Sequence, residues 1–152
     1  NVRMSTDLRD LYQEIILKHS RKPKNSGTMD DADGEANGNN PLCGDRIAVC
    51  VKLDGERIAD AKFEARGCAI TVASASMMTE LLIGKTIDEA RAERARFIDL
   101  LTLKDPPEVA DDDELAALLG VRQFPARIKC AALPWQTLAA AMDGSEPEVT
   151  TE

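Results

Sequence analysis

The chain has 152 residues, a length that suits one compact domain with a hydrophobic core, so we expect residues 1–152 to form a single domain. Hydrophobic residues make up 43% and charged residues 30% of the chain, the ordinary balance of a soluble protein. Its formal net charge of −8 disfavours nonspecific binding to nucleic acid, for which a basic surface is needed.

The sequence gives no sign of a membrane segment. Its N-terminal residues are polar and carry no secretory signal, and the longest uncharged stretch, residues 67–79, is too short to span a bilayer. We therefore expect a cytoplasmic protein with no nucleic-acid partner and no membrane partner. In that reducing compartment, the four cysteines are expected to bind metal, act in catalysis or lie buried rather than form disulfides.

The first predicted element is an amphipathic helix that ends before Pro23. We expect a helix cap among residues 5–7, and we expect residues 1–4 to be disordered or the remnant of an expression tag. His19, the single histidine, falls at the end of this helix, where a solvated or capping side chain is favoured over a metal ligand. Apolar residues recur along the helix at helical spacing: Leu8, Leu11, Tyr12, Ile15 and Ile16.

A pair of strands is predicted next. Residues 28–41 are rich in Asp, Asn and Gly and indicate a loop, or at most a polar edge strand. The hydrophobic period then becomes two, which predicts a strand with one apolar face. Asp54 and Gly55 predict a hairpin turn, and a change of phase near Asp60 in the return strand is typical of a bulge. The apolar face of the first strand carries Ile47, Val49, Val51 and Leu53.

The rest of the chain is mainly helical. The segment AITVASASMMTELLIG is apolar nearly all round, which predicts a helix buried in the domain centre and ended by Gly84. Thr86 and Glu89 form the capping-box pattern of the next helix. A short helix is expected after residues 111–113, and the final helix is expected to begin at Pro125.

Pro134 stands inside this final helix, and its ring predicts either a kink at Cys130 or a helix that restarts at Pro134. The polar residues 143–152 are expected to form a flexible tail. The order of elements indicates an α+β fold, with a small antiparallel sheet packed against several helices.

The stretch NPLCGDRIAVC places a thiol and a carboxylate, Cys43 and Asp45, two residues apart. In extended backbone these two side chains point to the same side. Cys50 has the opposite parity, so it is expected to face away from them.

Two further cysteines lie far downstream. Cys68 is at the mouth of the buried helix, where backbone N–H groups and the helix dipole favour a thiolate. Cys130 is in the final helix, one turn after Arg127 on the same face. With the Cys43–Asp45 pair, these sulfurs are able to close a tetrahedral shell around zinc. Equally, the residues alone allow the downstream cysteines to be small buried hydrophobes and Asp45 to be a turn residue.

Four motifs resemble the iron–sulfur cluster assembly proteins of the IscU/NifU N-terminal type: LYQEIILKHSRKPKNSG, NPLCGDRI, ARGCAITVASASMMTELLIGKTIDEA and FPARIKCAALPW. They occur in the family's order and cover most of the chain from Leu11 to Leu138. The spacing of the last two cysteines and an insertion-like stretch at residues 97–123 resemble the SufU branch. Lys129 stands where IscU-type members carry a histidine, so roles that depend on that histidine do not carry over.

The resemblance implies a ligand set, a fold and partners. Its metal-ligand positions fall on Cys43, Asp45, Cys68 and Cys130. It further implies a tightly bound zinc, a three-stranded sheet packed against helices, a SufS-like pyridoxal-phosphate cysteine desulfurase as partner, and a downstream iron–sulfur assembly scaffold.

These inferences favour a zinc-bound sulfur acceptor that receives persulfide sulfur from the desulfurase and stimulates it, a sulfurtransferase-like accessory protein. Cys43, on a Gly-containing loop, is expected to accept the sulfur, and Arg127 to stabilise the released thiolate or persulfide. One alternative is a scaffold on which a nascent [2Fe–2S] cluster is assembled and transferred, with iron or the cluster in place of zinc. Another is a structural zinc module that only binds a partner.

Overall fold

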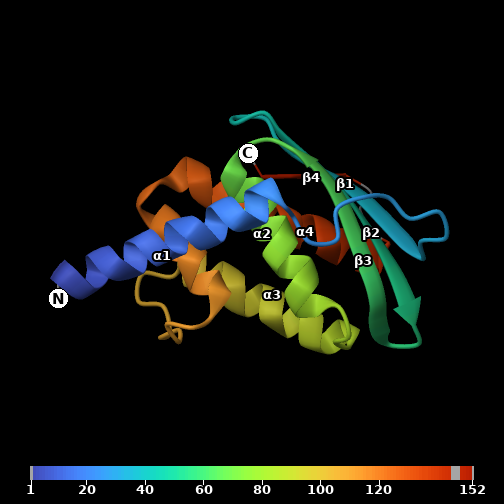
Figure 1. Ribbon diagram of the computed structural model, residues 1–152. Coiled ribbons are helices and arrows are strands. Elements are labelled where there is room, and N and C mark those ends of the chain that lie inside the picture. Colours follow the sequence, from blue (N-terminus) through green and yellow to red (C-terminus); the bar gives the residue numbers. More distant parts are fainter. Residues whose placement is uncertain (1, 145–147, 152) are drawn as a thin grey trace.

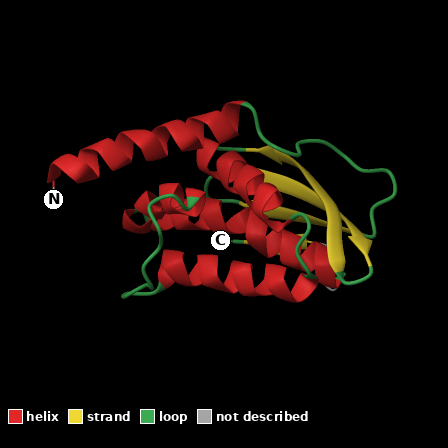
Figure 2. Ribbon diagram, turned by 60° about the horizontal axis from the view of Figure 1, so that its bottom comes forward, coloured by secondary structure: helices red, strands yellow, loops and turns green. Residues whose placement is uncertain are grey.

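The computed structural model describes residues 2–144 and 148–151, in which the helices lie together on one side of a four-stranded sheet (Figures 1 and 2). The strand order is β3-β2-β1-β4. Within these residues, no helix combines the length and the apolar character needed to cross a bilayer. The elements in chain order are α1 (Val2–Arg21), β1 (Gly34–Asn40), β2 (Asp45–Asp54), β3 (Arg57–Arg66), α2 (Ala69–Leu82), α3 (Ile87–Thr102), the 3₁₀ helix η1 (Glu114–Gln123), α4 (Pro125–Asp143) and β4 (Glu148–Thr150).

The predicted α+β class is confirmed, but the sheet has four strands where the resemblance implied three. The additional strand is β4, which pairs in parallel with β1. It falls in the stretch expected to be a flexible tail, of which residues 145–147 and 152 lie outside the described residues. Thr151 extends this attachment, because its N–H donates to the carbonyl of Asn39 at 3.1 Å.

Helix α1 begins earlier than the sequence indicates. Its backbone is helical from Val2, so residues 5–7 lie within the helix instead of capping it, and residues 2–4 are helical instead of disordered. Neither proline nor glycine interrupts residues 2–21, so nothing in the sequence stops the helix from extending to its start.

The lone histidine is buried and not solvated, which makes that expectation wrong. His19 is 4% exposed, with Nδ1 at 2.7 Å from Ser76 Oγ and Nε2 at 3.1 Å from a carboxylate oxygen of Glu114. His19 thereby connects the end of α1 to α2 and η1, two elements that lie much later in the sequence.

Strand β1 is an interior strand, although its sequence GEANGNN predicts a loop or an edge. It pairs antiparallel with β2 and lies against α4. Gly38 makes this approach possible, because a side chain there would overlap the Thr137 hydroxyl and Leu133 of α4. Strand β1 therefore lacks the usual alternation of apolar side chains, and its backbone packs directly against α4 instead.

The predicted β2–β3 hairpin and its bulge are confirmed. The two turn residues are Gly55 and Glu56, one position later than the Asp54–Gly55 pair that predicted the turn, because Asp54 still pairs with Arg57. The register shifts where Lys52 faces Asp60 and Leu53 faces Ile58. This shift is the bulge predicted near Asp60. The apolar face of the hairpin is buried under the helices, as Val49, Val51, Ile58 and Phe63 are each at most 1% exposed.

Helices α2 and α4 form the centre of the molecule. Most of α2, including the unbroken run from Ala73 to Thr79, is buried, as its uniform apolar character predicts. Trp135 of α4 is fully buried and donates its indole N–H to Ser74 Oγ at 3.2 Å, and Ser74 in turn donates to the carbonyl of Ala131 at 2.6 Å. Small residues on α2 thus let the two helix backbones approach closely.

The flanking helices follow their sequence signals. Thr86 and Glu89 form both hydrogen bonds of the capping box at the start of α3. Asp113 caps the helix that follows, which is a 3₁₀ helix. Helix α4 begins at Pro125 as predicted and continues through Pro134 to Asp143, so it does not restart there. Leu133 and Trp135 on either side of the proline are fully buried.

Candidate metal centre

The first two site residues lie where β1 passes into β2. Asn40 ends β1, and its carbonyl accepts the N–H of Cys43 at 3.2 Å, which closes the turn. Asp45 opens β2 directly opposite Asn40 in the antiparallel register. Asp45 is fully buried, whereas Cys43 is half-buried on the turn.

Asp45 is held in place by the start of α2. Its Oδ1 accepts the backbone N–H of Cys68, the residue that caps α2, at 3.0 Å. Gly67 allows this contact, because a Cβ at that position would overlap the Asp45 carboxylate. Gly67 also has φ of +155°, a backbone conformation that favours glycine. This close fit fixes the carboxylate relative to the cysteine that follows.

The third element is α4, which brings in Cys130. The sulfurs of Cys43 and Cys130 and a carboxylate oxygen of Asp45 lie within 4.8 Å of one another. Cys68 lies beside this group but outside it, with its sulfur 3.5 Å from Thr71 Oγ1. The fold therefore brings three of the four predicted ligands together and places the fourth at their edge.

The donor set fits a zinc ion. Bonds of about 2.3 Å to sulfur and about 2.0 Å to oxygen would put tetrahedral ligand atoms about 3.5 to 3.8 Å apart, within the spacing seen here. Two or three thiolates with one carboxylate suit zinc or an iron–sulfur species better than magnesium or calcium. Cys68, whose sulfur lies close enough to Cys130 to raise its pKa, would be the fourth ligand.

The electrostatics of the centre oppose an uncompensated thiolate. Burial raises the pKa of the Cys130 thiol far above its ordinary value, and the neighbouring Asp45 carboxylate and Cys68 sulfur raise it further. Arg127 lies on the exposed side of these sulfurs, and its own pKa is raised first by Cys130 and then by Cys68. The positive charge of Arg127 therefore stands close to the sulfurs of Cys130 and Cys68.

Cys50 is separate from the centre. It lies half-buried on β2 between Glu35 of β1 and Lys62 of β3, and it does not belong to the ligand group. Burial and the Glu35 carboxylate raise the pKa of Cys50, which keeps it a thiol. The parity argument from the sequence is thereby confirmed.

One residue of the centre was missed by the sequence analysis. The side chain of Asn40 is fully buried, and its Nδ2 lies 3.5 Å from Asp45 Oδ2 and 3.7 Å from Cys130 Sγ. The local signal was its place as the first residue of the NPLCGD stretch, but its contact with Cys130 spans 90 positions and follows only from the fold.

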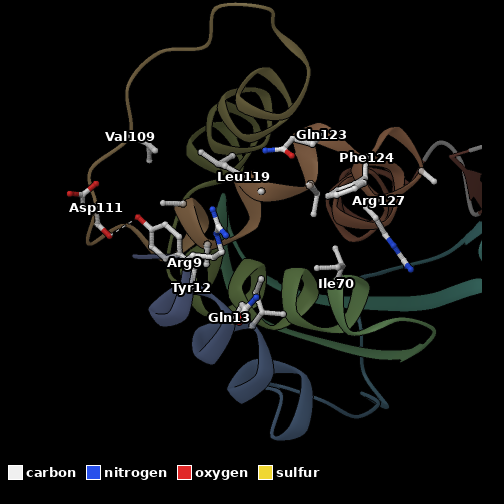
Figure 3. A pocket seen from close by; sticks show the side chains of 16 residues that line it. Arg9, Tyr12, Gln13, Ile70, Val109, Asp111, Leu119, Gln123, Phe124 and Arg127 are labelled. Carbon is white, nitrogen blue, oxygen red and sulfur yellow. Dashed lines mark hydrogen bonds between the residues drawn. The ribbon is translucent and has the colours of Figure 1, made fainter. Parts of the chain in front are cut away.

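A large groove of about 1140 Å³ lies beside the centre, between α1, η1 and the start of α4. Tyr12 spans one end of it, where its hydroxyl donates to the carbonyl of Asp111 at 3.4 Å (Figure 3). Arg127 contributes to the other end, but its guanidinium points away from the groove. The groove is therefore a neighbour of the metal centre. Its walls are mostly apolar and include Ile16, Ile70, Leu119, Val121 and Phe124.

Comparison with known sequences gives a consistent result. The NifU-like N terminal domain family matches residues 11–143. A Bacillus subtilis protein named zinc-dependent sulfurtransferase SufU is 44% identical over 134 residues, which are 88% of this chain and 90% of that protein. A Streptococcus pyogenes protein named iron–sulfur cluster assembly scaffold protein IscU is 38% identical over 138 residues, covering 91% of this chain and 86% of that protein.

Solved structures show the same fold. One from Fervidobacterium islandicum, named as an iron–sulfur cluster assembly scaffold for the SUF system, has a TM-score of 0.78 and 35% identity, covering 85% of this chain and 94% of that one. A NifU-like N-terminal protein from Brucella abortus has a TM-score of 0.79 and 27% identity, covering 88% of this chain and 93% of that one.

Proposed function

This chain belongs to the family of NifU-like N terminal domains, and from that membership and its metal centre we propose that it serves iron–sulfur cluster assembly as a zinc-bound sulfur acceptor. It receives persulfide sulfur from a cysteine desulfurase and stimulates that enzyme. The observation that carries the proposal is the convergence of two thiols and a carboxylate, from three separate elements, within 4.8 Å. The 44% identity to a zinc-dependent sulfurtransferase supports the same reading.

The metal ligands are Cys43, Asp45, Cys130 and Cys68. Bound zinc keeps cysteine ligands deprotonated at neutral pH, which offsets the burial that raises the pKa of Cys130.

Cys43 is the sulfur acceptor. It lies on a turn outside the regular elements and is half-buried, whereas Cys130 is fully buried in α4 and out of reach of another protein. The Cys43 thiolate attacks the outer sulfur of the desulfurase persulfide. A new S–S bond forms on Cys43, the old S–S bond breaks, and its electron pair leaves on the desulfurase cysteine as a thiolate.

Arg127 stabilises the negative charge of this centre. Three thiolates, one carboxylate and a divalent ion together leave two negative charges, and the guanidinium lies beside two of the sulfurs. Its exposure lets it reach a persulfide that is carried on Cys43.

The partner is a SufS-like pyridoxal-phosphate cysteine desulfurase that docks over the centre. Two large apolar side chains flank it: Leu42, next to Cys43, is 68% exposed, and Phe124, three residues before Arg127, is 59% exposed. Exposed apolar groups of this size around a reactive site are typical of a protein contact. The sulfur then passes to a downstream iron–sulfur assembly scaffold. We place the reaction in the cytoplasm, a reducing compartment that suits four free cysteines.

A scaffold role is the second candidate, favoured by the 38% identity to an assembly scaffold protein. The same thiolates would hold a nascent [2Fe–2S] cluster. Anaerobic reconstitution with iron and sulfide separates the two roles. A stable visible chromophore that transfers to an apo-acceptor indicates a scaffold, whereas retained zinc and faster desulfurase turnover indicate sulfur transfer.

The test of the acceptor role compares Cys43→Ala with Cys50→Ala. After incubation with a desulfurase and cysteine, persulfide on the chain is measured by thiol labelling and mass spectrometry. Cys43→Ala should abolish uptake, and Cys50→Ala should take up sulfur like the wild type. Unchanged uptake by a folded Cys43→Ala protein would remove Cys43 from the acceptor role. A role as a structural zinc module predicts that neither variant affects sulfur uptake except through stability.

A further inference from the structure

Asn40 is an unusual buried residue because the nitrogen and the oxygen of its side-chain amide have different surroundings. The side chain is 0% exposed at the end of β1. Its Nδ2 faces Asp45 Oδ2 at 3.5 Å and Cys130 Sγ at 3.7 Å, and the sulfur contact is longer because sulfur is the larger atom. Its Oδ1 is buried and has no partner among the described residues. The amide donors are thus directed at two metal-ligand positions while the acceptor is left unpaired.

This orientation follows from the chemistry of the ligands. A carboxylate and a thiolate are both acceptors, so an amide turned the other way would place its oxygen against two anions. The amide nitrogen carries two N–H groups, one for each ligand. An unpaired buried carbonyl is unfavourable, so a residue whose role is only packing would be better replaced by an apolar one.

Asn40 also contacts a third ligand position through its backbone. Its carbonyl accepts the N–H of Cys43 at 3.2 Å, and its backbone pairs with Asp45 in the sheet. One residue therefore links the turn that carries Cys43 to the carboxylate of β2 and to the sulfur of α4.

The charge of the centre explains what these donors do. The cysteines and Asp45 bring an excess of negative charge that a divalent ion does not cancel, and buried anions need hydrogen-bond donors. Arg127 supplies charge from the exposed side. Asn40 approaches from the buried side, where an additional charged group would be costly to desolvate.

We propose that Asn40 is a positioning residue that stabilises the anionic forms of Asp45 and Cys130 and keeps both as fixed ligands while Cys43 reacts. The inference rests on the proposed metal site. In this proposal the amide N–H groups of Asn40 help to determine how tightly the ion is held, although Asn40 does not itself bind the ion.

The test uses Asn40→Leu, which keeps the size of the side chain and removes both donors, and Asn37→Leu as its matched control. Asn37 lies on the same strand but is exposed on the other face of the sheet. Zinc affinity is measured by competition with a chromophoric chelator. Asn40→Leu should weaken zinc binding about 10- to 100-fold, the range for groups that orient metal ligands, and Asn37→Leu should leave it unchanged.

Two further readouts separate positioning from a structural role. In the cobalt-substituted protein, loss of an N–H···S contact should move the sulfur-to-metal charge-transfer band to lower energy, because the thiolate electrons are less stabilised. Metal-free Asn40→Leu loses an unpaired buried carbonyl but also a donor to the buried Asp45 carboxylate, and these opposite effects should leave its unfolding temperature close to that of the wild type. A structural role predicts the other pattern: an unchanged cobalt spectrum and a clearly less stable metal-free protein.

Asn40→Ser is the second variant in case Asn40→Leu does not fold, since it keeps one donor and adds no bulk. Its zinc affinity should fall below that of the wild type, with a smaller shift of the cobalt band. Zinc affinity and a cobalt band equal to those of the wild type in a folded Asn40 variant would overturn the inference. A wild-type protein that binds neither zinc nor cobalt would instead overturn the proposed function itself, so the two failures are distinguishable.

Discussion

Replacing Gly67 with alanine should damage the fold and the metal centre together. The added Cβ would overlap Asp45 Oδ1 and lie 2.9 Å from Cγ and 3.1 Å from Cα of the same residue. Asp45 has no room to withdraw, because it is fully buried and paired with Asn40 in the sheet. The backbone angle φ of +155° adds strain for any residue with a side chain.

The magnitude has two parts. Holding a non-glycine residue in such a conformation costs about 1 to 3 kcal/mol, and forcing extra atoms into a packed site costs about another 1 to 3 kcal/mol. A total of about 2 to 6 kcal/mol is a large share of the roughly 5 to 15 kcal/mol by which domains are stable. The Tm should fall by at least about 5 °C. Because the Asp45 carboxylate has to turn, zinc affinity should also fall by about tenfold or more.

Two other glycines provide the controls. Gly55 has φ of +62° but open space around it, so Gly55→Ala measures strain alone, about 1 to 2 kcal/mol, with normal zinc binding. Gly120 has open space and no positive φ, so Gly120→Ala should be neutral or slightly stabilising. Calorimetry with and without zinc measures all three variants. A Gly67→Ala protein that is no less stable than Gly55→Ala, and that binds zinc like the wild type, would refute the reasoning.

Three further predictions follow from named contacts. Thr86→Ala removes the capping box of α3 and should cost about 1 kcal/mol in urea unfolding, whereas an unchanged midpoint would mean the cap contributes nothing. Leu42→Ser and Phe124→Ser should weaken stimulation of the desulfurase without changing zinc content, and full stimulation by both would place the docking surface elsewhere. For the metal-free protein, the raised pKa of Cys130 means that the folded chain keeps a proton that the unfolded chain releases above about pH 8.5. This contribution to stability is complete below that pH and is lost as the pH rises further, so the unfolding free energy of the metal-free protein should fall from about pH 8.5 upward, and it should fall less in Cys130→Ala.

Sequence signals correctly predicted the structural elements that depend only on residues close together in the chain. The β2–β3 hairpin with its bulge, the capping box of Thr86 and Glu89 and the start of α4 at Pro125 were all predicted correctly, with the hairpin turn one residue later than expected. Each depends on residues within one turn or one hairpin, where spacing and backbone preference are sufficient. The family resemblance added the ligand positions, which cysteine spacing alone left open.

Tertiary structure decided the rest, because the deciding contacts join residues far apart in the chain. Strand β1 has a polar sequence but is an interior strand because β2 and β4 pair with its two edges, and Gly38 lets α4 pack closely on its face. His19 was buried by helices that follow it much later in the chain. The approach of Asn40 to Cys130 across 90 positions leaves no trace in local periodicity. Sequence identified the atoms able to bind a metal, but only the packing of α4 and α2 against the sheet could set the distances between them.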